Sequence, residues 1–413
     1  MSAAVVNPVL EQVCRRASTR AVLEVAWEGE VLRADDVMEH AGVTRSTALQ
    51  ALDALGELGL VEELSCTGEG PVMGRPARRF RLRVGVEAGV VVGLEAGQQK
   101  MAATVTDLAG NVLARWGIDI PDADPAHHQD PALRRELARS AVATALHEAG
   151  AQDVDVLVMG IGVPAPVDGH GCSPEGELGF WRIMHAGLLE MFREDFAHVR
   201  IENDAALAAL AELHFGAARQ EQDFVTLLLA WGIGAGVVMD GQLLRGANGA
   251  VGELGFFEMV EGIGTSAGFH EIVEEWVRGH WRKDELPAEH PWREYLAGVR
   301  ARESLLALLD PEDPVMAPLF HELVRLTGRI VDLMAQVYDP AAVVIAGPVA
   351  ADIGPVLDAV REGQTDTTGR LRPKVLASPL GEDVISLGAA AAARELSMGD
   401  VIEWALAKRR LQS

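Results

Sequence analysis

The sequence has few of the residues that build disulfide frameworks, zinc sites or membrane spans. Its 413 residues include three cysteines, Cys14, Cys66 and Cys172, which lie far apart and form no Cys-x-x-Cys pair. This scarcity excludes a disulfide-stapled scaffold. No apolar run approaches the roughly 20 residues that a membrane-spanning helix needs, and the N-terminal stretch lacks the basic start and apolar run of a signal peptide. We therefore expect a cytoplasmic protein with reduced thiols and no membrane association.

Positive charge is also scarce. The chain has 36 Lys and Arg against 61 Asp and Glu, a formal net charge of -25 at pH 7. Residues 1–85 hold ten Arg, no Lys and twelve acidic residues, which leaves a net charge of -2 there and -23 in the remainder. Because an acidic surface repels polyanions, only the first 85 residues are suited to approach nucleic acid. Five of their arginines fall within the nine residues "RPARRFRLR" at 75–83.

The first 85 residues have the pattern of a winged helix-turn-helix. Apolar residues at helical spacing predict three short helices, within residues 18–29, 33–42 and 43–61. Gly42 is a candidate stop for the second helix, and Thr44 is a candidate N-cap for the third. The chain then becomes extended by residue 64, forms a loop at 65–74, and alternates as a strand at 78–84. Three helices followed by a two-stranded hairpin match this DNA-binding fold, with the loop as its wing.

In this fold the third helix enters the major groove, and side chains of its first turns reach the base edges. The candidates for base contacts are Thr44, Arg45, Ser46, Thr47 and Gln50. The candidates for phosphate contacts are Arg75, Arg78 and Arg79, with Arg81 and Arg83 beside them. Two alternatives stay open. For the strip, and above all for Arg81 and Arg83, the alternative is that the arginines pair with the acidic body and clamp the two domains together. For Arg45, the alternative is a position on a solvated helix surface without a DNA contact.

From residue 86 onward, strands alternate with helices, which indicates the α/β class. A three-stranded meander is expected at 86–120. Later strands run into Gly- and Pro-rich loops, which let the backbone come close to a ligand. Two similar halves, each with the order βββαβα, are expected at 86–200 and 222–395.

Several motifs together resemble the ROK family (repressor, open reading frame, kinase), and its transcriptional regulators in particular. They are "GRP" at 74–76, "GIGVPAPVD" at 160–168, "ENDAALAALAE" at 202–212, "GIGAGVVMDGQLLRGANGAVGELG" at 232–255, and "VVIAG" with "LGAAAAA" near the end. The resemblance implies a two-lobed actin-like, ribonuclease-H-like body, a sugar site between the lobes, and dimers or tetramers. The expected domains are a winged helix-turn-helix at 1–85, a first lobe at 86–205, and a second lobe with a C-terminal helix at 206–413.

The same resemblance implies which residues bind the sugar. Asn203 and Asp204 follow the end of a strand, where an amide can bond sugar hydroxyls and where the family's kinases use the Asp as a general base. Glu253 and Glu271 match positions that contact sugar hydroxyls in the family, a task that suits carboxylates because they accept bidentate hydrogen bonds. For each of the four residues, the alternative is a helix cap or a local salt bridge.

Departures from the family pattern point away from kinase activity. Family kinases carry an Asp-x-Gly-Gly-Thr phosphate loop. The matching run here is "LEAGQQK", with Glu95, Gln98 and Gln99 at the Asp, second Gly and Thr positions. Lys100 either attracts phosphate or is a surface residue, and Pro348 stands where the family prefers Gly. We therefore expect no nucleotide cofactor.

The family's structural zinc site is also missing from the sequence. Phe256 replaces its His, and the run "EMVEGIGTSAGFHE" at 258–271 contains no Cys. Four protein ligands for zinc are not available there, so we expect no bound metal. The missing His normally also touches the sugar, and Glu175 stands near the position of an Asn beside it. The ligand site is therefore altered.

We interpret the chain as a sequence-specific DNA-binding regulator, with repression as the expected mode, that binds double-stranded operator DNA. Its body is expected to sense a sugar, a sugar phosphate or another small ligand, with Asp204 as a vestigial kinase base and no enzyme activity. Two alternatives belong to other classes. The first is an ATP-dependent sugar kinase that uses Asp204 as its general base, and the second is a scaffold that binds another protein through its acidic surface.

Overall fold

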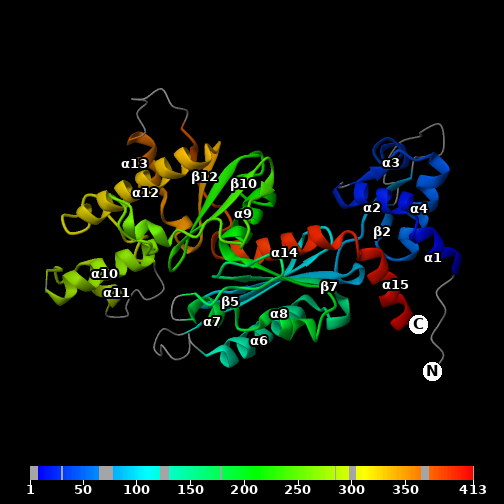
Figure 1. Cartoon of the computed structure of the whole chain (residues 1–413), viewed down its shortest axis with the longest axis horizontal. Helices are drawn as coiled ribbons and strands as arrows, with labels where there is room; N and C mark the ends of the chain where they lie inside the picture. Colours follow the sequence, from blue (N-terminus) through cyan, green and yellow to red (C-terminus); the bar gives the residue numbers. More distant parts are fainter. Residues whose placement is uncertain are drawn as a thin grey trace.

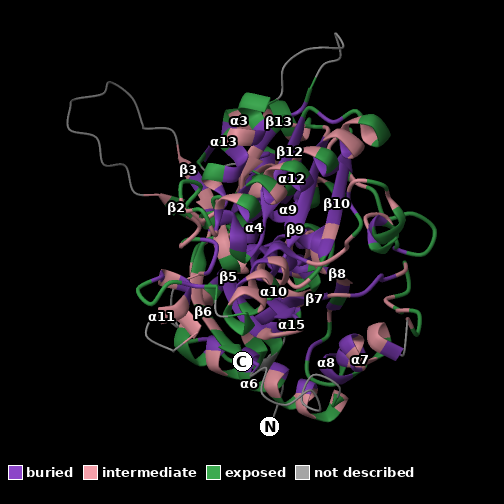
Figure 2. Ribbon diagram, turned by 90° about the vertical axis from the view of Figure 1, so that its left-hand side faces the viewer, coloured by how far each residue is buried: buried purple, intermediate pink, exposed green. Residues whose placement is uncertain are grey.

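The computed structural model describes residues 8–28, 31–64, 78–120, 130–176, 179–283, 285–296, 304–363 and 372–412. Three sheets organise these residues, one of three strands and two of five strands. Figure 1 shows the N-terminal helices at one end of the molecule and the sheet of residues 224–377 toward the other end, with the sheet of residues 90–203 between them. Buried residues are concentrated in the strands of the five-stranded sheets and in the helices that cover them (Figure 2).

The N-terminal unit, which comprises the described residues up to 82, packs four helices against a small antiparallel sheet. Its elements are α1 (Pro8–Cys14), α2 (Ala17–Glu28), β1 (Leu32–Arg33), α3 (Ala34–Ala41), α4 (Arg45–Glu57), β2 (Val61–Leu64) and β3 (Arg79–Leu82), with strand order β1-β3-β2. The three predicted helices are confirmed as α2, α3 and α4, although α4 ends at Glu57 and α1 was not predicted. Gly42 ends α3 in a left-handed conformation, and the Thr44 side chain accepts a hydrogen bond from the Thr47 backbone N–H. The predicted loop and Arg75 lie outside the described residues.

The first five-stranded sheet has the strand order β6-β5-β4-β7-β8. Its elements are β4 (Val90–Ala96), β5 (Lys100–Asp107), β6 (Val112–Asp119), α6 (Pro131–Ala149), β7 (Val156–Val163), α7 (Phe180–His185), α8 (Leu188–Arg193) and β8 (Val199–Asn203). β4 pairs antiparallel with β5 and parallel with β7, so the predicted meander is confirmed and leads into a parallel segment. α6 covers one face of the sheet by packing on β4, β5 and β6.

The second five-stranded sheet repeats this order as β11-β10-β9-β12-β13. Its elements are β9 (Phe224–Leu229), β10 (Ile233–Met239), β11 (Gln242–Leu243), α10 (Phe269–Arg282), α11 (Pro291–Leu296), α12 (Ala317–Tyr338), β12 (Ala342–Ala346), α13 (Gly354–Gly363) and β13 (Lys374–Ala377). Each sheet therefore contains two antiparallel and two parallel strand pairs in the same order, which confirms the predicted similarity of the two halves. Neither α12, with its 22 residues, nor any other helix within the described ranges has the length and apolar character to cross a membrane.

Two C-terminal helices return from the second sheet to the rest of the molecule. α14 (Val384–Ser397) packs on β4, β5 and β7 of the first sheet and on α9 (Asp204–His214), and α15 (Val401–Gln412) shares a hydrophobic core with the N-terminal unit. Close packing depends on glycine, because a Cβ atom at Gly388 would overlap the Leu207 carbonyl oxygen of α9. The predicted boundaries at 85 and 205 remain predictions, and α14 follows the second sheet in sequence while packing on the first.

Replacing Gly388 by Ala should lower the melting temperature, because overpacking of a close helix contact costs typically about 1–3 kcal/mol. Gly328→Ala is the matched control: Gly328 also lies inside a helix, but a Cβ atom there meets nothing within 4 Å. The control should stabilise the protein slightly, since Ala favours a helix over Gly by about 0.8–1 kcal/mol. Thermal unfolding followed by circular dichroism measures both, and equal effects of the two changes would contradict the packing argument.

Candidate functional site

Polar side chains gather where the parallel strands of the first sheet end. Glu95 at the end of β4 is in register with Gly162 of β7, and Val163 is in register with Asn203 at the end of β8. Asn203 is the N-cap of α9, and its side-chain oxygen accepts a hydrogen bond from the Ala206 N–H at 3.0 Å. Because parallel strands end on one edge of a sheet, these residues face a common region, which is the usual ligand position in open α/β sheets.

The second lobe supplies Glu253 to the same region. The Asn203 side-chain amide donates to the Ala165 carbonyl at 3.2 Å and lies 3.4 Å from the Glu253 carboxylate. The loop that carries Glu253 approaches the first lobe backbone to backbone, since a Cβ atom at Gly249 would overlap Val167. The structure thus brings together Asn203, Asp204 and Glu253, three of the four residues predicted for the ligand, where the two lobes meet; this junction is called the cleft below. The helix-cap alternative holds for Asn203, and its role in ligand binding stays a prediction.

Glu271, the fourth candidate, is placed differently. It lies in the first turn of α10, half-buried, and burial together with Glu274 and Glu275 raises the pKa of its carboxyl. Among the described residues, no hydrogen bond or ion pair links Glu271 to Asn203 or Glu253. Its role in ligand binding therefore stays a prediction.

Burial decides the electrostatics of the cleft. Burial raises the pKa of Asp204 to about 7, a rise that the Ala205 backbone N–H opposes and the Glu253 carboxylate reinforces. Burial also raises the pKa of Glu253. The pKa of Glu95 is raised to about 8, again by burial, although the nearby Lys100 ammonium lowers it. The cleft therefore holds carboxyl groups that exchange protons near neutral pH and that can accept or donate hydrogen bonds to hydroxyls.

Two cations, Arg134 and Lys100, lie beside this site. The sequence did not indicate the first, and it left two interpretations open for the second. Arg134 of α6 is fully buried, and it donates to the carbonyls of Ala96 and Gly97 at 2.8 and 3.0 Å, so it holds the loop that follows β4. An Arg in an amphipathic helix gives no sequence signal of such burial. Lys100, which was either a phosphate ligand or a surface residue, forms an ion pair with Glu382 at 3.1 Å.

Replacing Glu95 by Gln should make the protein more stable than wild type by an amount that grows from pH 5 to pH 8. The folded state keeps the Glu95 proton to a pH of about 8, above the ordinary value, so it binds more protons than the unfolded chain and loses stability as the pH rises. A tenfold difference in proton affinity corresponds to about 1.4 kcal/mol. Melting temperatures at several pH values measure this. The exposed Glu148→Gln serves as the control, and a pH-independent difference would contradict the assignment.

The base-contact candidates lie together on the first turns of α4. Thr44, Arg45, Ser46 and Gln50 are exposed, and Thr47 is half-buried. Arg45 forms an ion pair with Asp35 of α3 at 2.6 Å, and the Gln50 side-chain oxygen accepts a hydrogen bond from Arg16 at 3.1 Å. An exposed ion pair of this kind contributes about 0–1 kcal/mol, so Arg45 can exchange it for another partner.

The arginines of the strip are paired with acidic residues. Arg78 bridges Asp53 of α4 and Glu63 of β2 at 2.7 Å each, and both contacts raise the pKa of its guanidinium. Arg79 is half-buried on β3. Arg81 pairs with Glu62 of the neighbouring strand at 2.5 Å, and Arg83 pairs with Glu87 at 3.7 Å. The acidic partners of Arg78 and Arg81 lie within the N-terminal unit, so the clamp alternative does not hold for these two. Arg83 pairs with Glu87, just beyond the predicted boundary at 85, as that alternative expected.

No cluster of three or more His, Cys, Asp or Glu residues suited to a metal ion occurs in the described ranges. The donor set required for zinc is thus not assembled by the residues that the structure describes. At the position of Phe256 the side chain is an exposed ring beside Phe257.

The family model for the ROK family matches residues 91–395. The chain belongs to the ROK family. It is 25% identical to a glucokinase of Streptomyces coelicolor over 337 residues, 74% of this chain and 98% of the enzyme. It is 24% identical to the xylose repressor of Bacillus spizizenii over 245 residues, which are 58% of this chain and 60% of the repressor. Kinases and repressors are thus similar to the chain at nearly equal identity.

Solved structures of ROK proteins share the fold. The crystal structure of a ROK family glucokinase from Streptomyces griseus in complex with glucose and AMPPNP has a TM-score of 0.60 at 26% identity, covering 74% of this chain and all of the enzyme. A ROK family transcriptional regulator, a homologue of the Escherichia coli MLC protein, has a TM-score of 0.65 at 19% identity and covers 95% of this chain and 98% of its own. The ROK body is therefore a two-lobed, actin-like fold of mixed sheets, and the shared fold of the regulator spans most of the chain.

Proposed function

We propose that this ROK protein is a sequence-specific DNA-binding transcriptional regulator of the repressor type. The observation that carries the proposal is the N-terminal unit, which adds to the ROK body three successive helices and a β2–β3 hairpin, the elements of a winged helix-turn-helix. Its α4 presents Thr44, Arg45, Ser46 and Gln50 together on an exposed helix start. Such a helix start is the part that reads base edges in the major groove. A sugar kinase has no use for this unit.

The ion pairs of the arginines are compatible with DNA binding, because phosphates or base edges can replace the carboxylate partners. Arg45 gives up its carboxylate partner when a base edge or phosphate arrives, and this exchange costs little because exposed pairs are weak. Arg78 is half-buried between Asp53 and Glu63 and is held more firmly. The acidic remainder of the chain repels DNA and directs the N-terminal unit toward it. A homodimer or homotetramer in the cytoplasm, with two such units, would read a site with two half-sites.

The proposed effector is a sugar or a sugar phosphate, bound by Asn203, Asp204 and Glu253 between the lobes. The amide donates and accepts hydrogen bonds to hydroxyls, and the two carboxyls bond vicinal hydroxyls with or without a proton. A ligand that prefers one arrangement of the lobes shifts the protein toward that arrangement, and this shift is how binding would change operator affinity.

A sugar kinase is the second candidate, and one observation favours it. The pKa of Asp204 near 7 suits a general base. The loop after β4 argues against it: Gln98 and Gln99 stand where the phosphate loop has small and hydroxyl residues, and Lys100 is bound to Glu382. We therefore propose that Asp204 binds ligand without catalysing phosphoryl transfer.

Arg45→Ala should weaken binding to an operator fragment, selected from genomic DNA with the wild-type protein, by about 1–3 kcal/mol. Asp35→Asn should strengthen binding a few-fold, because it releases Arg45 from its ion pair. Fluorescence anisotropy over a series of salt concentrations measures both. Arg139→Ala, which removes an exposed arginine of α6, is the control with unchanged affinity. Absence of salt-sensitive, sequence-preferring binding by the wild type would remove the proposal.

Glucose, xylose or their phosphates should raise the melting temperature of the wild type, and Glu253→Gln should abolish the rise. The stabilisation by ligand amounts to about 2.7 kcal/mol at a hundred times Kd. Glu261→Gln, an exposed carboxylate on the following loop, is the matched control. ATP added with each sugar should give no sugar phosphate. Turnover that vanishes in Asp204→Asn would instead establish the kinase, and the absence of any shift across these ligands would favour the scaffold.

A further inference from the structure

α14 leads from the cleft to the N-terminal unit. The short turn η6 (Gly381–Asp383) precedes it beside the cleft, where Glu382 pairs with Lys100 and Asp383 pairs with Arg115 at 3.0 Å. The other end of the helix reaches the turn between β5 and β6 and the end of α2. One helix therefore spans the distance between the proposed ligand site and the proposed DNA-binding unit.

The packing of α14 leaves it little freedom to shift against its neighbours. Ser386 and Thr104 of β5 share a buried hydrogen bond of 2.8 Å between their hydroxyls. Cβ atoms at Gly93 of β4 or at Gly388 would overlap carbonyl oxygens across these contacts. α9, which α14 touches at Gly388, begins with the cleft residue Asp204. A displacement of α9 is thus transmitted to α14 because closely packed interiors resist compression.

Arg394, near the end of α14, bonds the body and the N-terminal unit at once. Its Nε donates to the Leu108 carbonyl at 2.6 Å, and a terminal nitrogen donates to the Trp27 carbonyl at 2.8 Å. Its guanidinium also lies over the Trp27 ring, 4.8 Å from the ring centre. The fork of an arginine is suited to hold two acceptors in fixed directions, which a lysine cannot do.

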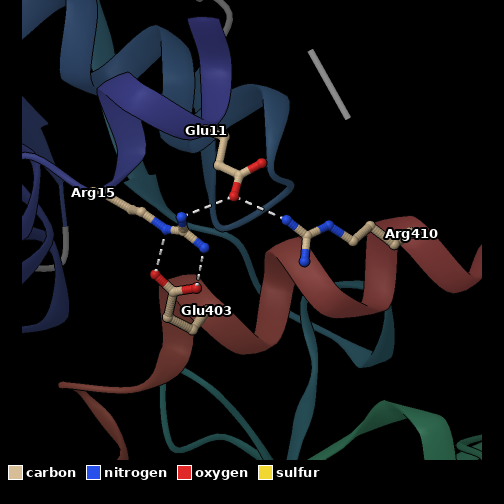
Figure 3. A network of polar contacts seen from close by, with 4 residues as sticks. All are labelled: Glu11, Arg15, Glu403 and Arg410. Atoms are coloured by element: carbon tan, nitrogen blue, oxygen red, sulfur yellow. Dashed lines mark hydrogen bonds and ion pairs between the residues drawn. The ribbon is translucent and has the colours of Figure 1, made fainter. Parts of the chain in front are cut away.

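α15 adds a second attachment. Arg15, which follows α1, makes a bidentate contact with Glu403 at 2.8 and 3.0 Å, and Glu11 accepts from both Arg15 and Arg410 at 2.9 Å (Figure 3). The apolar face of α15 belongs to a hydrophobic cluster that joins the N-terminal unit to first-lobe residues such as Val91, Leu108 and Leu157; it comprises Val401, Ile402, Ala405 and Leu406. On the body side, Lys408 pairs with Asp155 at 2.7 Å.

We propose that α14 and α15 set the orientation of the N-terminal unit relative to the ligand cleft, with Arg394 as the positioning residue that joins the two. The chain itself connects the unit to the body through residues 83–89 alone, and a single connection leaves a small domain free to rotate. The helix pair supplies the additional contacts that fix the angle. This inference rests on the proposed function, because the unit needs a fixed angle only to read spaced half-sites.

The test measures, in the absence of DNA, how firmly the N-terminal unit is held against the body. Spin labels at the exposed positions of Glu39→Cys in α3 and Glu148→Cys in α6, with Cys66→Ser and Cys172→Ser as background, report the distance between the unit and the body. In Arg394→Gln the width of the distance distribution should about double, as for a domain held by a flexible connection. Arg361→Gln is the matched control: Arg361 also donates two bonds to a backbone carbonyl, that of Val375, but within the second lobe. It should leave the distribution unchanged.

If Arg394→Gln does not fold, an exchange of charges between Arg15 and Glu403 provides a second test. Glu403→Arg should broaden the distribution, and adding Arg15→Glu should narrow it again by restoring an opposite pair. Operator affinity should fall about tenfold in each broadened variant, because the unit must then be ordered on binding. Distributions that stay narrow in both Arg394→Gln and Glu403→Arg overturn the inference. A wild type that binds no DNA but shows the expected distances overturns the proposed function alone.

Discussion

The fit of α14 between the first sheet and α9 is the constraint on which the arrangement of the molecule depends. This fit brings backbone against backbone, which requires glycine at Gly93, Gly160 and Gly388 and small side chains along α14. Because a closely packed interface has no room for sliding, α9 and α14 keep one relative position. That position places Asn203 and Asp204 at the cleft and Arg394 at the N-terminal unit. The two proposed sites are thus attached to the same rigid group of elements.

Charge is arranged differently at the two sites. At the N-terminal unit, Arg45 is exposed and Arg78 half-buried, and both are paired with carboxylates that the proposed DNA binding would displace. The free energy of DNA binding then depends on the difference between the arginine–carboxylate pair that is lost and the arginine–DNA contact that is gained. This dependence favours DNA sites that offer contacts of good geometry over sites that attract the protein by charge alone. At the cleft, burial removes water from the carboxyls and raises their pKa values. There the protein keeps acidic groups that carry less than their full charge near neutral pH.

The region of the family's phosphate loop shows how a binding site can change its use. Arg134 holds the carbonyls of Ala96 and Gly97 from below, and Lys100 is engaged with Glu382 in the turn that begins α14. Both cations therefore stabilise the contact between the loop and its surroundings. They make this region a structural junction between the loop, α6 and the turn before α14.

The sequence by itself determined the local features: the stop at Gly42, the cap at Thr44, the meander after residue 86 and the similarity of the two halves. These follow from hydrophobic period and capping, which act over a few residues. Only the tertiary structure decided that Arg78 faces Asp53 and Glu63, that Arg134 is buried, that Glu271 makes no bond to Asn203 or Glu253, and that α14 and α15 return to the first lobe and the N-terminal unit. Such contacts join residues far apart in the chain. They depend on how the elements pack, and no periodic pattern records them.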